Sequence, residues 1–88
     1  MTRVDKYTAV MLDYNGCFDC ARVEGFDSSK PVFFVRIKQF DLAAIQAEMK
    51  DETVSVYLPA LLGSLKKIEG LLSLAKESGV WQRSASTN

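Results

Sequence analysis

The residues with the most obvious chemical potential lie in one stretch, Asp13-Tyr14-Asn15-Gly16-Cys17-Phe18-Asp19-Cys20. Its two cysteines could supply thiolates to zinc, but a closed structural zinc site needs four ligands. The chain has two cysteines in all and no histidine, so a metal would have to be shared between two copies. Redox cysteines with this spacing usually begin a helix that lowers a thiol pKa, and no helical pattern starts at Cys17. We therefore expect no metal and no cofactor, and two small packing cysteines.

Asp13 follows the apolar run Val10-Met11-Leu12 and is followed by Tyr14-Asn15-Gly16. This short stretch resembles the first motif of the haloacid dehalogenase superfamily of phosphatases, where an apolar strand ends in Asp-x-Asp-Gly. The resemblance implies that Asp13 would attack phosphorus, with a magnesium ion held nearby. Asn15 stands at the family's second aspartate, and an amide cannot handle the leaving-group proton in the same way. We expect that the chain is not an enzyme, and keep a degenerate or truncated relative as an alternative.

The same Asn15-Gly16 pair is a strong hairpin signal, because a type I′ turn needs positive φ at both central residues. We therefore predict strands over residues 7–14 and 17–24, joined at this pair. In a regular strand the two cysteines then point to opposite faces, which also disfavours a metal site.

The rest of the chain predicts a third strand and two helical segments. Residues 32–38 alternate, with three apolar side chains directed inward, namely Phe33, Val35 and Ile37. Asp41 is a good N-cap for a helix that ends near Lys50. A longer apolar stripe predicts a main helix that starts at Pro59, which suits a first turn, and ends with Gly79 as its C′ residue.

These elements predict an α+β fold, with a three-stranded antiparallel β-meander followed by two or three α-helices packed on one face. We assign residues 1–81 to one small domain and residues 82–88 to a flexible C-terminal tail.

Composition excludes several classes of function. Eleven basic residues balance eleven acidic residues among the 88, so no net field gathers nucleic acid or an anionic membrane surface. The first residues lack the apolar stretch of a signal peptide, and no run approaches the length of a membrane span. We expect a cytoplasmic protein with no membrane contact.

The outer face of the predicted sheet is the candidate binding surface. It combines aromatic and basic side chains, namely Tyr7, Phe18, Phe34, Arg22, Arg36 and Lys38. Aromatic residues and arginine are enriched in the cores of protein interfaces, whereas zero net charge disfavours the alternative of stacking single-stranded nucleic acid. Helices covering this face would remove both options.

The function that we expect is non-enzymatic binding of another protein or complex, as an adaptor or as an inhibitor. A phage-type inhibitor such as an anti-CRISPR protein is an analogy of size and missing chemistry alone. A homodimer is a further option for the same surface.

Overall fold

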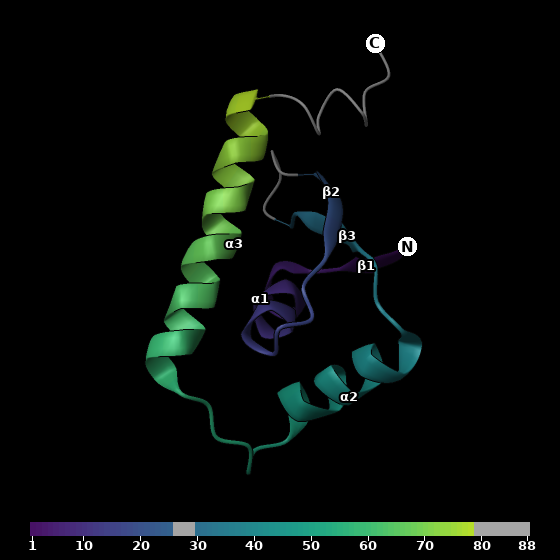
Figure 1. Ribbon diagram of the computed structural model, residues 1–88, viewed down its shortest axis with the longest axis vertical. Helices are drawn as coiled ribbons and strands as arrows, with labels where there is room; N and C mark the ends of the chain where they lie inside the picture. Colours follow the sequence, from purple (N-terminus) through teal and green to yellow (C-terminus); the bar gives the residue numbers. More distant parts are fainter. Residues whose placement is uncertain (26–29, 79–88) are drawn as a thin grey trace.

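The computed structural model describes residues 1–25 and 30–78. The chain forms, in order, β1 (Thr2–Val4), α1 (Lys6–Tyr14), β2 (Cys20–Glu24), β3 (Val32–Val35), α2 (Gln39–Lys50) and α3 (Leu58–Ser78) (Figure 1). In Figure 1, α3 runs along one side of the molecule and α1 lies between it and the strands.

The three strands form one antiparallel sheet in the order β1-β3-β2. The central strand β3 places Phe34 opposite Arg3 of β1 and opposite Arg22 of β2. The pairing of β2 shifts between Cys20 and Arg22, which marks a bulge or irregularity. The predicted α+β class and the three-stranded antiparallel sheet are thus confirmed. The predicted meander followed by helices is wrong, because β3 lies between β1 and β2 and helix α1 comes between the first two strands in the chain. The first strand, Thr2–Val4, was not predicted.

The predicted strand over residues 7–14 and the hairpin at Asn15-Gly16 are wrong, because this segment is helix α1. Asp5 caps its start by accepting a hydrogen bond from the Thr8 N–H at 2.8 Å. At its end, Gly16 has a φ of 74° and its N–H donates to the Asp13 carbonyl at 3.0 Å.

The next N–H, that of Cys17, donates to the Leu12 carbonyl at 2.8 Å. These two bonds and the left-handed glycine are the features of a Schellman motif, which ends a helix. Gly16 therefore has the positive φ that the predicted hairpin required, but here this φ ends a helix. Asn15 keeps a negative φ of −90°, which a type I′ turn does not allow.

The other strands are shorter than predicted. The predicted strand 17–24 forms β2 only from Cys20, and the predicted strand 32–38 ends at Val35. Its predicted inner face is confirmed, because Phe33 and Val35 are fully buried and Ile37 is partly buried against the core.

The two later helices agree with the prediction except at one cap. Helix α2 begins at Gln39, so Asp41 lies in its first turn and is not the N-cap, yet its charge there still favours the helix dipole. The predicted end near Lys50 and the start of the main helix around Pro59 are confirmed. The predictions for Gly79 and for the tail 82–88 lie outside the described residues.

Helix α1 is the element that joins the layers. Its Ala9 and Leu12 are fully buried in a core that also takes Val23 and Phe33 from the sheet and Ile68 from α3. The two other helices contact α1, and α1 contacts β3. Within the part of the chain that the structure describes, no helix has both the length and the apolarity to cross a membrane.

Substitution of two phenylalanines tests the assignment of this core. Phe33 is fully buried, whereas Phe40 on α2 is 82% exposed. We expect Phe33→Ala to lower the free energy of unfolding by about 3–5 kcal/mol, because it removes a core ring and leaves a cavity. Phe40→Ala should stay within about 0.5 kcal/mol. Urea unfolding followed by circular dichroism measures both, and equal losses would contradict this core.

Substitution of two glycines tests the assigned end of α1. Gly16 has positive φ, so Gly16→Ala strains the backbone and should destabilise the fold by about 1 kcal/mol. Gly63 lies inside α3, and a Cβ added there meets nothing within 4 Å. Gly63→Ala should therefore stabilise the fold by about 0.5–1 kcal/mol. Changes of the same sign at the two positions in thermal unfolding would contradict the assigned helix end.

Candidate functional site

The structure brings two of the six predicted binding residues together on the outer face of the sheet. The Arg22 guanidinium lies 4.1 Å from the centre of the Phe34 ring and donates a hydrogen bond of 2.8 Å to Glu24. Arg3 lies over the same ring at 5.9 Å. This is a cation–π arrangement in which arginine side chains already contact the aromatic ring.

The other four predicted residues lie elsewhere. Phe18 packs edge-on against the buried Phe33 at 6.2 Å, so it belongs to the core side. Arg36 is exposed and pairs with Asp19 at 3.1 Å. Lys38 immediately precedes α2, and Tyr7 projects from α1. The six predicted residues therefore do not form one surface in the structure.

The phosphatase-like stretch has a different structural setting from the family motif. Asp13 lies in the last turn of α1, not at the end of a strand, and accepts a hydrogen bond from Lys67 at 3.1 Å. Both cysteines are free and half-buried. Among the described residues, no three Cys, Asp or Glu side chains group closely enough to hold a metal ion.

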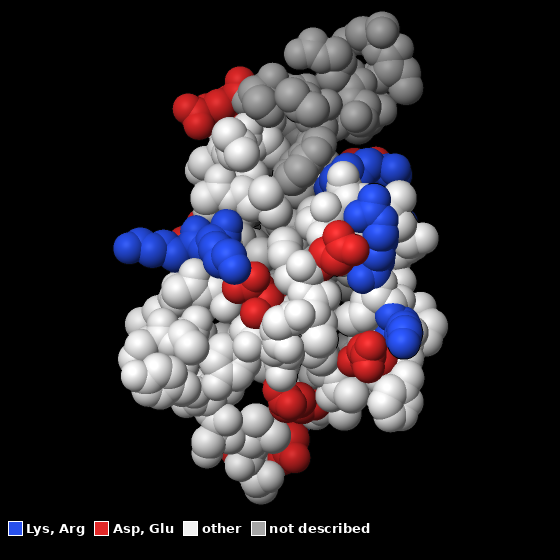
Figure 2. Space-filling view, viewed as in Figure 1, with Lys and Arg blue, Asp and Glu red and all other residues white. Residues whose placement is uncertain are grey.

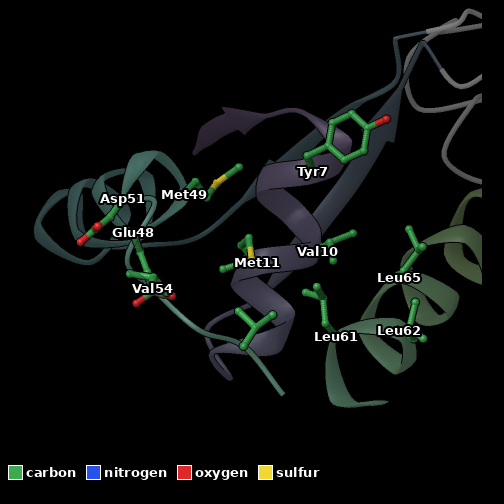
Figure 3. Close-up of a pocket in the computed structure, with 11 residues that line it drawn as sticks. Tyr7, Val10, Met11, Glu48, Met49, Asp51, Val54, Leu61, Leu62 and Leu65 are labelled. Carbon is green, nitrogen blue, oxygen red and sulfur yellow. The ribbon is translucent and has the colours of Figure 1, made fainter. Parts of the chain in front are cut away.

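A different surface has the geometry of a binding site. An apolar groove of about 400 Å³ opens between α1, the end of α2 and the first half of α3 (Figure 3). We call it the α1–α3 groove. Its walls are aliphatic and thioether side chains, namely Val10, Met11, Met49, Leu61, Leu62 and Leu65.

The mouth of the α1–α3 groove is also apolar. Tyr7 borders it with 69% of its surface exposed, and Val54 and Val56 border it from the segment between α2 and α3. This segment is attached to α1, because the Tyr57 N–H donates to the Tyr14 hydroxyl at 2.7 Å. Figure 2 shows a broad area without charged residues over the first turns of α3.

The charged residues that line the α1–α3 groove are two acidic residues at one end, Glu48 and Asp51. The Asn15 side chain donates a hydrogen bond of 3.4 Å to the Glu48 carboxylate, and this bond links Glu48 to the end of α1. Hydrogen bonds from the side chain and backbone of Thr53 lower the pKa of Asp51. Among the described residues that line the groove, none is basic.

Among the residues that line the α1–α3 groove, Tyr7 alone is one of the six binding residues predicted from the sequence. The missed signal is an excess of apolar residues around Pro59. The apolar stripe of α3 includes residues that a single packing face does not use, and Leu58 and Leu62 remain more than half exposed. An apolar stripe wider than one helix face needs is typical of a helix that also contributes to a surface site.

The comparisons with known proteins identify no relative. No family model, no curated protein and no solved structure matches the chain.

Cys20 provides a chemical test of the described packing. Burial raises the pKa of its thiol above the ordinary value, and the neighbouring Asp19 charge acts in the same direction. We expect folded Cys20 to react with iodoacetamide at pH 8 at least about threefold more slowly than a small peptide thiol. Mass spectrometry of tryptic peptides gives the rate.

The urea-unfolded chain is the control, and there the two thiols should react alike. The raised pKa of the Cys20 thiol also makes stability depend on pH. Its contribution to the free energy of unfolding is fully present below the ordinary thiol pKa and is lost as the pH rises through the raised pKa. A folded-state rate equal to that of the free thiol would contradict the burial of Cys20.

Proposed function

We propose that this chain is a non-enzymatic protein-binding module and that the α1–α3 groove is its binding surface. The observation that carries the proposal is a groove of about 400 Å³ whose walls are apolar and open to solvent. Contiguous apolar surface of this kind is unfavourable in water, and in monomeric proteins it commonly marks a place where a partner binds.

The polar residues of the α1–α3 groove favour a protein segment over a small apolar acid. Glu48 and Asp51 would repel the carboxylate of a fatty acid at the end where they lie. Met11 and Met49 give the walls flexible, polarisable side chains. Such side chains adapt to the varied apolar residues of a protein partner.

The two alternatives from the sequence receive less support from the geometry. A base that stacked on Phe34 would have to displace Arg22, which lies 4.1 Å from the ring and is also paired with Glu24. The phosphatase-like alternative needs Asp13 at the end of a strand, but Asp13 lies on α1 and pairs with Lys67.

An adaptor and an inhibitor of a larger complex both need such a surface, and the proposal includes both roles. Action in the cytoplasm, and inhibition of the phage type in particular, are the narrower forms of this proposal. In each of these forms of the proposal, the partner protein contacts the first half of α3.

The test compares two exposed leucines on α3. Leu62 lines the α1–α3 groove and is 52% exposed, whereas Leu74 is 59% exposed and does not line it. Peptides selected on the wild-type chain from a random display library should bind Leu62→Gln at least about fivefold more weakly, because the substitution places an amide in an apolar contact. Fluorescence anisotropy with the selected peptides measures the loss.

Leu74→Gln is the matched control, since it makes the same chemical change on the same helix. It should leave peptide binding unchanged, and thermal unfolding should show that both variants are folded. Selected peptides that bind both variants equally would contradict the groove as the binding surface. Failure to select any peptide would contradict the proposed function itself.

A further inference from the structure

We infer that the α1–α3 groove receives an amphipathic helix of a partner protein, and that this helix places a lysine or arginine beside Glu48 and Asp51. The inference deepens the proposed function and rests on it. It specifies the conformation of the occupant and the charge at one end of it.

The walls of the α1–α3 groove favour a helical occupant over an extended one. They are formed by α1, α3 and the end of α2, and the sheet does not line the groove. An extended segment leaves its backbone N–H and C=O groups unpaired unless it adds to a sheet edge. A helix pairs these groups internally, so it can bury its apolar face against side chains alone.

Three backbone donors of the segment between α2 and α3 are not available to an extended occupant. Its Thr53 N–H donates to the Asp51 carboxylate, and its Val54 N–H donates to the Asp51 carbonyl. The Tyr57 N–H is held by the Tyr14 hydroxyl at 2.7 Å. These three backbone donors are already engaged within the chain itself.

The size of the α1–α3 groove suits a few turns of helix. Helix α1, one of its walls, has nine residues, which corresponds to a length of roughly 13 Å. Two to three turns of a second helix would match this length and present apolar residues at positions i, i+3, i+4 and i+7. These residues would contact Met11 from one wall and Leu62 and Leu65 from the other (Figure 3).

Charge complementarity fixes the sign of the residue at one end of the occupant. Glu48 and Asp51 both line that end, and no basic residue lines the described part of the groove. Two hydrogen bonds from Thr53 orient the Asp51 carboxylate, and Asn15 donates a hydrogen bond to the Glu48 carboxylate. A carboxylate on the occupant would be repelled there, whereas a lysine or arginine would be attracted.

The probe is a fluorescein-labelled peptide of about 16 residues made of leucine and lysine, with its leucines on one helical face. A second peptide has glutamate at each lysine, and a third has the first composition in an order that disperses the leucines. We expect the first peptide to bind at least about tenfold more tightly than either of the others at low salt. Fluorescence anisotropy gives the affinities, and circular dichroism reports helix formation in the bound peptide.

The charge requirement is tested with the double variant Glu48→Gln/Asp51→Asn. It should weaken the lysine peptide about fivefold or more and reduce the preference over the glutamate peptide. The matched control Asp19→Asn/Glu77→Gln changes the net charge equally at exposed positions that do not line the groove, and it should preserve the preference. Equal binding of the two peptides to the wild type would overturn the charge assignment.

Two further outcomes overturn the inference. Equal affinity for the peptide with dispersed leucines would show that no helix face is recognised. Analytical ultracentrifugation that reveals a dimer dissociated by Leu62→Gln, but not by Leu74→Gln, would make a second copy of the chain the occupant. Each of these failures differs from failure of the proposed function, because peptides selected from the library would still depend on Leu62.

Discussion

The burial of α1 between the sheet and α3 is the interaction on which the rest of the structure depends. Ala9 and Leu12 are fully buried, and this nine-residue helix contacts β3 as well as both longer helices. A helix this short is unstable alone in water, so its stability comes from packing and from its caps. Asp5 and Gly16 fix both ends, and the Gly16 turn then directs the chain towards β2.

The sequence predicted those parts of the fold whose local and tertiary preferences agree. The inner face of β3, with Phe33 and Val35, follows from alternation, and Pro59 marks the first turn of α3 because proline lacks an N–H. The segment 7–14 is different. Its β-branched and aromatic residues favour a strand locally, but burial of one helical face against the sheet determines its conformation.

Helix signals were nevertheless present at both ends of this segment. Asp5 three residues before Thr8 is a typical N-cap spacing, and a glycine after a helical run is a typical C′ residue. The Asn15-Gly16 pair fits a hairpin and a helix end equally well by composition. Only the long-range packing of α1 decides between them, and a single sequence does not encode that packing in a readable local pattern.

The predicted binding surface does not form for the same reason, because it assumed a strand over residues 7–14. With residues 7–14 as a helix, Tyr7 leaves the sheet and Phe18 turns to the core, while Phe34 and Arg22 remain on the outer face. The α1–α3 groove lies beside helix α3, whose exposed Leu58 and Leu62 show that this helix has more apolar surface than the described core accommodates.

The hydrogen bond between the Tyr57 N–H and the Tyr14 hydroxyl, at 2.7 Å, has a thermodynamic consequence for any occupant. It ties one border of the α1–α3 groove to α1, so part of the conformational entropy of that segment is already lost in the free chain. Binding to a surface ordered in advance needs less interaction energy to reach a given affinity. The hydrogen bond between Tyr57 and Tyr14 thus favours binding by restraining the border of the groove in the free chain.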